Sequence, residues 1–290
     1  MSGMLEGIHL DTGHHRARRR PGATLLLGGI IVTLVLLLAG VSLFWTPYAP
    51  SDTAEELRLG PPSAVHWAGT DKLGRDLFTQ LMVGARLALA VAVGSALIAA
   101  LCGGTLGLIA ASARRRAVDE SMSYLFDVLI AFPTILLAML IVTVWGASTL
   151  SAIAAIGISG TAVVSRLSRV SALRILKTEY VKAAVTCGAS RASILVRHVL
   201  PNIYPILVVQ LTLIASGAIL AEASLAYLGL GAPPPESSWG RMLLEAQRSV
   251  LTAPWGAVFP GLAIVLTVLG LNFLGDGLRE LLDPEVGKGA

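Results

Sequence analysis

The chain has 290 residues, of which 54% are hydrophobic and 14% are charged, and its mean hydropathy is +0.74. Soluble domains carry about 25% charged residues, so this composition argues against an ordinary soluble protein. The apolar residues fall in blocks long enough to cross a bilayer, which takes roughly 20 residues. The formal net charge of +4 is explained by basic loops beside anionic lipid, so nucleic acid is not expected as a partner.

Six apolar blocks predict an all-α, polytopic membrane protein with about six transmembrane helices. A single membrane domain is expected over 23–285, between tails over 1–22 and 286–290. The third and fourth blocks nearly touch, so we expect a tight reversal at Gly146. The blocks span residues 23–45, 87–111, 124–145, 147–164, 203–227 and 257–274.

The basic residues assign the two sides of the membrane. With the N-terminus in the cytoplasm, 16 of the 22 Lys and Arg residues lie in the inner segments. The positive-inside rule then predicts that both termini are cytoplasmic. Segments 46–86 and 228–256 become outer loops, and 165–202 becomes a long cytoplasmic loop. The arginines before residue 23, followed by an apolar block, have the pattern of a signal peptide. The block is longer than the apolar core of a signal peptide and no A-x-A site follows it, so we expect no cleavage.

Small residues in the second block predict close helix packing. Gly103 and Gly107 form a G-x-x-x-G pair, which brings helix backbones together where lipid gives no hydrophobic driving force. Packing within this chain is favoured over a contact with another subunit. Cys102 and Cys187 are poorly placed to pair, and no histidine has a partner at zinc-ligand spacing, so neither a disulfide nor a metal site is expected.

Two carboxylates lie inside apolar blocks, where such a group is costly unless it is solvated or paired. Glu222 falls in the outer part of the fifth block, and Asp127 falls near the inner end of the third. Both are candidates for a path or a gate through the membrane. Trp239 and Trp255 are expected in the aromatic belt at the outer interface.

The cytoplasmic loop has the pattern of a helix, a turn and a second helix. Thr178 is predicted to cap the first helix, and Gly188 to end it in a left-handed conformation. Ser190 is predicted to cap the second helix, and Pro201 to limit its length.

The first of these two helices has an apolar face made of small side chains. Glu179 and Lys182 point away from that face and can pair. Such a helix suits docking into a groove on another protein, or lying on the membrane surface, and the residues alone leave both open. The face is formed by Tyr180, Ala183, Ala184 and Cys187.

This loop resembles the EAA loop of binding-protein-dependent ABC importer permeases. The family pattern is E-A-A, three residues, G, nine residues and then I-x-L-P. Lys182 stands where the family has Glu, and His198 where it often has Ile, so a carboxylate contact from position 182 is not carried over. Glu179 is a hypothetical substitute for that charge. The resemblance implies an ATPase-coupling loop formed by Glu179, Tyr180, Lys182, Ala183, Ala184, Gly188, Ala189, Arg191, Leu200 and Pro201.

Three further segments narrow the resemblance to one group of permeases within this family. Residues 66–76 look like the H-x-x-G-T-D-x-x-G-R-D signature of dipeptide, oligopeptide and nickel permeases. Residues 228–240 are similar to the family's outer segment before the last crossing, and 272–284 resemble its ending. The set resembles the C-type permease subunit of a dipeptide or oligopeptide system. Its outer-loop signature comprises Gly69, Thr70, Asp71, Gly74, Arg75, Asp76, Ser238, Trp239 and Gly240.

The resemblance implies a type I ABC importer permease in the bacterial inner membrane. It would move di- or oligopeptides by alternating access together with a B-type permease subunit, one or two ABC ATPase subunits and an external substrate-binding protein. The chain has no G-x-x-x-x-G-K-[ST] motif, so ATP and Mg are expected on the ATPase partners, and this subunit is expected to be non-catalytic with no cofactor or metal of its own.

Three alternatives remain beside the peptide importer. A nickel importer of the same family shares these motifs. A secondary transporter that works without ATP would need coupling-ion sites or repeated broken helices near the midplane. A membrane-embedded enzyme would need reactive groups that converge within the crossings.

Overall fold

The computed structural model describes residues 22–113, 115–234 and 236–282. Within these residues the regular structure is helical, apart from one isolated bridge between Thr70 and Asp76. The predicted tails, apart from Gly22, and the motif at Asp283 and Pro284 lie outside the described residues.

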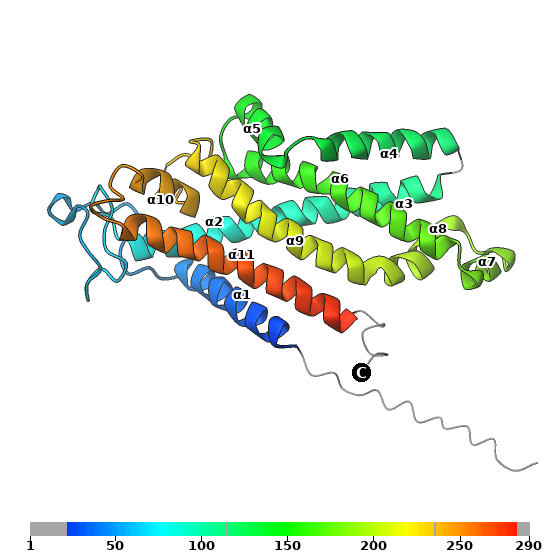
Figure 1. The fold of residues 1–290 in the computed structure, drawn as a ribbon, viewed down its shortest axis with the longest axis horizontal. Coiled ribbons are helices and arrows are strands. Elements are labelled where there is room, and N and C mark those ends of the chain that lie inside the picture. Colours follow the sequence, from blue (N-terminus) through cyan, green and yellow to red (C-terminus); the bar gives the residue numbers. More distant parts are fainter. Residues whose placement is uncertain (1–21, 114, 235, 283–290) are drawn as a thin grey trace, which may run out of the picture.

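The helices run along one long axis (Figure 1). The segment between α1 and α2 gathers with α10 at one end, which we call the α10 end, and α7 lies at the opposite end, the α7 end. The elements are α1 (Ala23–Ser42), η1 (Glu55–Leu57), α2 (Leu77–Ile98), η2 (Ala99–Gly103), α3 (Gly104–Ser112), α4 (Arg116–Ala131), α5 (Thr134–Trp145), α6 (Thr149–Leu176), α7 (Glu179–Thr186), α8 (Arg191–Ile194), η3 (Leu195–Val199), α9 (Leu200–Tyr227), α10 (Trp239–Ala246) and α11 (Trp255–Leu282).

Five helical stretches of the described chain are long and apolar enough to cross a membrane. They are α1, α2 continued through η2 and α3, α6, α8 continued through η3 and α9, and α11. A bent pair, α4 with α5, makes a sixth if it is counted as one span. The prediction of an all-α protein with about six crossings is confirmed.

The third crossing differs from the single helix predicted over 124–145. Helices α4 and α5 meet at an angle of 90°. The break lies at Phe132 and Pro133, both of which have extended backbone. A residue before proline is pushed out of the helical region, and proline itself favours the first turn of a new helix. Pro133 therefore divides the block, which its hydropathy did not reveal.

The fifth crossing is longer than predicted, and Pro201 does not separate it from the loop. The helix runs without interruption from Arg191 to Tyr227, with a π-helical turn over 195–199. Pro201 lies in the first turn of α9. Proline is tolerated there because it has no N–H to donate, and the π-turn before it adjusts the hydrogen-bond register.

Two more helices extend into segments expected to be loops. Helix α2 begins at Leu77, within the predicted outer loop 46–86, because the Asp76 carboxylate caps it by accepting a hydrogen bond from the Thr79 N–H at 2.7 Å. Helix α6 continues to Leu176, within the predicted loop 165–202. Gly146, by contrast, has φ +89° and forms the predicted tight reversal between α5 and α6.

Helices α6 and α9 form the centre of the bundle. Helix α6 contacts α2, α3, α4, α5 and α9, while α9 contacts α2, α10 and α11 as well. A Cβ built on Gly103 would lie 2.7 Å from the Thr161 carbonyl oxygen of α6, and one built on Gly107 would lie 2.6 Å from the Ser168 Cβ. The glycine pair therefore packs within this chain, as predicted.

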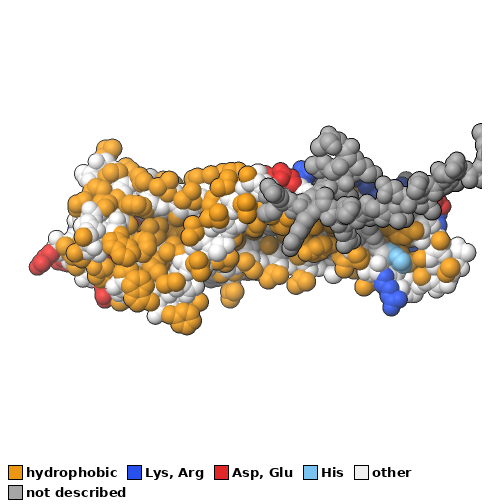
Figure 2. Space-filling view, turned by 90° about the horizontal axis from the view of Figure 1, so that it is seen from below, with side chains coloured by type: hydrophobic (Ala, Val, Ile, Leu, Met, Phe, Trp, Pro, Cys, Tyr) orange, Lys and Arg blue, Asp and Glu red, His pale blue; other side chains and the backbone are white. Residues whose placement is uncertain are grey.

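The outer surface of the bundle is largely apolar. Leu26, Ile30, Leu34 and Leu37 on α1 are all more than half exposed. Figure 2 shows hydrophobic side chains over most of the visible face, while Lys, Arg, Asp and Glu side chains are few. Because such a surface is unfavourable in water, its natural environment is lipid.

Helix α1 packs on α11 through glycines on both helices. A Cβ on Gly28 would lie 2.8 Å from the Gly270 carbonyl oxygen, and one on Gly277 would lie 2.5 Å from the Leu25 Cβ. The neighbouring Gly29 has open space around it. The same helix thus offers a tightly packed glycine and an unpacked one side by side.

We predict that Gly28→Val destabilises the protein and that Gly29→Val does not. The new side chain at position 28 meets backbone atoms of α11, and overpacking of this kind costs about 1–3 kcal/mol. The thermal unfolding midpoint of the purified chain in detergent measures the difference. Equal midpoints for the two variants would contradict the packing of α1 on α11.

Candidate functional site

The α10 end is organised by the Asp71 carboxylate, which is almost fully buried. Its Oδ1 accepts hydrogen bonds from the Leu73 and Arg75 backbone N–H groups at 2.8 and 2.9 Å. Its Oδ2 accepts from the Arg75 Nε at 2.7 Å and the Gln80 Nε2 at 2.9 Å. Four donors compensate the burial of this charge, so the loop before α2 has a fixed shape.

Arg75 joins this loop to α10. Its Nη2 donates to Glu245 Oε2 at 2.7 Å, and the other oxygen of Glu245 accepts from Arg241 Nε at 3.1 Å. We call the group of Asp71, Arg75, Glu245 and Arg241 the outer clasp. It connects residues 170 positions apart in the sequence.

Asp76 supports the same loop from its other side. Besides capping α2, its carboxylate lies 2.9 Å from His66 Nδ1. The His66 ring packs on Tyr48, and the Tyr48 hydroxyl donates to the Val65 carbonyl oxygen at 2.9 Å. Gly69 and Gly74, with φ of +80° and +75°, provide the turns between these contacts.

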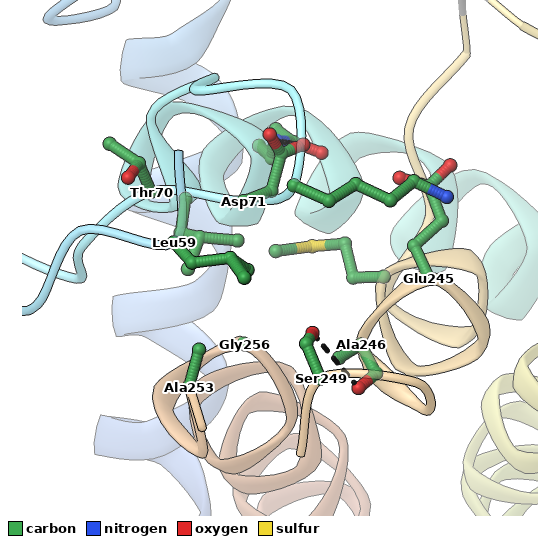
Figure 3. A pocket seen from close by; sticks show the side chains of 12 residues that line it. Leu59, Thr70, Asp71, Glu245, Ala246, Ser249, Ala253 and Gly256 are labelled. Atoms are coloured by element: carbon green, nitrogen blue, oxygen red, sulfur yellow. Dashed lines mark hydrogen bonds between the residues drawn. The ribbon is translucent and has the colours of Figure 1, made fainter. Parts of the chain in front are cut away.

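A small cavity of about 20 Å³ lies between the loop and the α10–α11 junction. Figure 3 shows Thr70 and Asp71 on one side of it, with Glu245 and Ser249 across from them. A volume of this size has room for about one water molecule. The space is therefore a packing gap beside the outer clasp and not a site for a peptide.

Trp239 and Gly240 pack inside the bundle. Trp239 is only 2% exposed, and its Nε1 donates to the Leu81 carbonyl oxygen at 3.1 Å. The expectation that Trp239 lies in the aromatic belt is therefore wrong, because the indole fills the gap left by Gly84. Ser238 caps α10 by accepting from the Arg241 N–H, and Gly240 approaches the backbone of Ala223.

Glu222 and Asp127 have different environments, and the structure does not bring them together. Glu222 is 4% exposed, lies where α9 packs under α10, and interacts with the Ser238 side chain, while its Oε1 has no hydrogen-bond partner. Asp127 is exposed and lies 3.2 Å from Arg166 Nη1. The second ion pair between α4 and α6 joins Asp119 to Arg169 at 2.5 Å.

The α7 end carries the predicted helix, turn and helix. Gly188 has φ +84°, as expected for the residue that ends α7, and Ser190 caps α8 by accepting from the Ser193 N–H at 3.2 Å. Thr178 does not cap α7. Its hydroxyl donates instead to the Ile175 carbonyl oxygen at 2.6 Å, at the end of α6.

Lys182 and Glu179 form the predicted ion pair, with Lys182 Nζ 2.6 Å from Glu179 Oε1. Both side chains are largely exposed. An exposed pair of this kind contributes about 0–1 kcal/mol to stability, so its main effect is on the charge of the helix surface. The two opposite charges cancel on this turn of α7.

Helix α7 is anchored by one side chain and leaves the others open. Val181 is buried in a cluster with Ala172, Ile194 and Val199. Tyr180 is 47% exposed, and its ring contacts His198 at 6.1 Å between centroids. The small residues Ala183 and Cys187 are exposed and Ala184 is partly so. The apolar face predicted from the sequence is thus available to a partner.

The α7 end is continuous with the centre of the bundle. Leu200 and Pro201 lie in the unbroken helix that joins α8 to α9. Arg191 Nη1 donates to the Ser112 carbonyl oxygen at the end of α3 at 2.9 Å, and Ala189 packs on the buried cluster below α7. The continuous helix through α8 and α9 therefore connects the α7 end to the α10 end.

The structure adds partners that the sequence motifs did not identify. Glu245 and Arg241 complete the outer clasp, Gln80 donates a further hydrogen bond to Asp71, and Asp119 with Arg169 joins α4 to α6. A charged residue in a largely apolar helix indicates that it has a partner. The sequence does not show which residue that partner is, because the partners are distant in sequence. Within 22–113, 115–234 and 236–282, no group of three His, Cys, Asp or Glu residues is placed to hold a metal ion.

A family model described as the binding-protein-dependent transport system inner membrane component matches residues 103–288. The dipeptide transport system permease protein DppC of Alkalihalophilus pseudofirmus is 41% identical over 261 residues, covering 90% of this chain and 86% of that protein. The glutathione transport system permease protein GsiD of Pectobacterium atrosepticum is 39% identical over 259 residues, covering 89% and 86%.

A solved structure shares the fold. It is the methionine ABC transporter MetNI in inward-facing conformations, with a TM-score of 0.58 and 18% identity. The match covers 70% of this chain and 96% of that chain. At this level of identity the likeness concerns the arrangement of helices.

We predict that Arg75→Ala lowers the free energy of unfolding by about 2–4 kcal/mol, because it leaves two largely buried carboxylates without their shared partner. Arg58→Ala is the matched control, since Arg58 pairs with Glu55 on the exposed surface of the same loop, and such a pair is worth about 0–1 kcal/mol. Thermal unfolding and limited proteolysis of residues 46–76 measure both. Equal effects would contradict the outer clasp.

Proposed function

This chain belongs to the family of binding-protein-dependent transport system inner membrane components, and we propose that it is the C-type permease subunit of an ATP-driven peptide importer. Its cargo is a di- or oligopeptide, and it operates by alternating access in the bacterial inner membrane. The two relatives described above, a dipeptide transport permease and a glutathione transport permease, support this class of cargo.

The observation that carries the proposal is the geometry of α7. This short helix presents an exposed face of small side chains and is anchored to the bundle through Val181. An amphipathic helix of this kind fits a groove on another protein. The partner is one of one or two ABC ATPase subunits, which hold ATP and Mg and carry out hydrolysis, while this chain is non-catalytic.

Five of the predicted coupling residues have direct roles in this proposal. Gly188 sets the angle between α7 and α8, and the Glu179–Lys182 pair offers a surface with no net charge to the ATPase. Leu200 and Pro201 lie where the motion of the loop enters α9. Both termini and this loop are cytoplasmic, in agreement with the distribution of basic residues.

The opposite end receives the cargo. A B-type permease subunit completes the path, and an external binding protein delivers the peptide to the α10 end. The outer clasp keeps this receiving surface rigid through the Asp71, Arg75 and Glu245 contacts. Rigid-body switching between two packed states then links ATPase closure to the opening of the path.

We predict that Gly188→Val lowers ATP-driven peptide uptake at least about tenfold, since a side chain branched at Cβ is strained by more than about 1–2 kcal/mol at φ +84°. Gly188→Asn is the matched control, because Asn tolerates the left-handed region. The measurement uses the complete complex in liposomes with binding protein and ATP. Uptake that is indifferent to ATP, or driven by an ion gradient alone, would overturn the importer.

A further inference from the structure

A larger cavity lies within the wall of the bundle, away from both ends. It has a volume of about 340 Å³ and is lined by α5, α6 and α9. Ligand sites are typically about 300–1,000 Å³, so its size suits a small peptide. The lining residues 156–163 of α6 and 210–224 of α9 flank the middle of these helices.

The cavity carries polar groups but no charge. None of the described residues that line it is Asp, Glu, Lys, Arg or His. Gln210 is partly buried, and its side-chain amide has no hydrogen bond with the described residues. Ser159 is 8% exposed, and its Oγ is covered and has no partner. The Gln210 amide is therefore free to hydrogen-bond to a partner from outside the fold, whereas the covered Ser159 hydroxyl is out of reach of such a partner.

A glycine keeps the cavity open. Nothing lies within 4 Å of a Cβ built on Gly217, although its helix α9 packs tightly elsewhere. A Cβ built on Gly160, on the facing wall, would lie 3.0 Å from the Ala99 Cβ and 3.2 Å from the Ile214 Cγ2, so that wall has no room for a side chain. A side chain at position 217 would therefore fill the space without meeting this chain's own atoms.

We propose that this cavity is a transient binding site for the peptide backbone, in which the Gln210 side-chain amide hydrogen-bonds to backbone amide groups. A primary amide offers one donor group and one acceptor, as a peptide group does. An uncharged lining makes no ion pair with cargo side chains, so the contact is shared by all peptides. This inference rests on the proposed peptide import and assigns the cargo contacts within it.

The test is ATP-driven uptake of two dipeptides, one with small and one with charged side chains, by the complete complex in liposomes. Gln210→Leu removes the amide, and Gln210→Asn retains one. Loss of one such hydrogen bond should raise the KM for uptake about two- to tenfold, equally for both peptides. Ser165→Ala is the control and should leave the KM unchanged, because Ser165 lies on α6 outside the cavity.

A second pair of variants tests the space itself. Gly217→Ile should reduce uptake strongly while the ATPase and the partner permease still copurify with the chain. Gly261→Ile on α11, where a new Cβ also meets open space, should leave uptake unchanged. The proposed site would be overturned if the Gln210→Leu and Gly217→Ile variants took up both dipeptides like the wild type. It would also be overturned if the variants lost uptake of only one dipeptide. Loss of copurification with Gly217→Ile would show a subunit interface instead and would also overturn it.

Failure of this inference is distinguishable from failure of the proposed function. If the wild-type complex does not import either dipeptide with ATP, the proposed cargo is wrong, and the proposed cargo site is wrong as well. If the wild type imports both and the cavity variants do so equally well, the importer stands and the cavity is not a cargo site.

Discussion

Close approach of helices at small residues is the constraint on which the rest of this structure depends. Lipid provides no hydrophobic driving force between helices, so packing must come from contact between backbones. Gly107 brings α3 against α6, and Gly28 with Gly277 brings α1 against α11. Because α6 and α9 are held in this way by neighbours on several sides, an uncharged cavity between them keeps its shape without polar bonds of its own.

The two ends of the bundle differ in the way their charges are used. At the α10 end, Asp71, Arg75 and Glu245 are partly or fully buried and satisfy one another. At the α7 end, Glu179 and Lys182 are exposed and their pair adds little stability. A cross-linked α10 end and a solvent-facing α7 end follow from this difference, and the helix through α8 and α9 joins them.

The sequence was sufficient for the class of fold and for part of the local geometry of the α7 end, where Thr178 does not cap α7 and Pro201 does not end the second helix. Hydropathy located the membrane helices, while Gly188, Ser190 and the Glu179–Lys182 pair act within a few residues of one another, where chain geometry is predictable. The roles assigned to these residues in coupling stay predictions. Long-range partners were missed, such as Glu245 for Arg75, because nothing local specifies them. The break at Pro133 and the burial of Trp239 were missed because hydropathy averages over a block.

The charge at position 182 bears on how the proposed ATPase contact would work. The family pattern places a Glu there, and this chain has Lys182 bonded to Glu179 one turn earlier. The pair leaves the α7 surface neutral, so attraction to a basic groove cannot hold the helix. Contact must then come from the shape of the small, exposed side chains at Ala183 and Cys187 and from the Tyr180 ring. Burial of apolar surface is less sensitive to salt than an ion pair, so ATPase association in this complex should depend weakly on ionic strength.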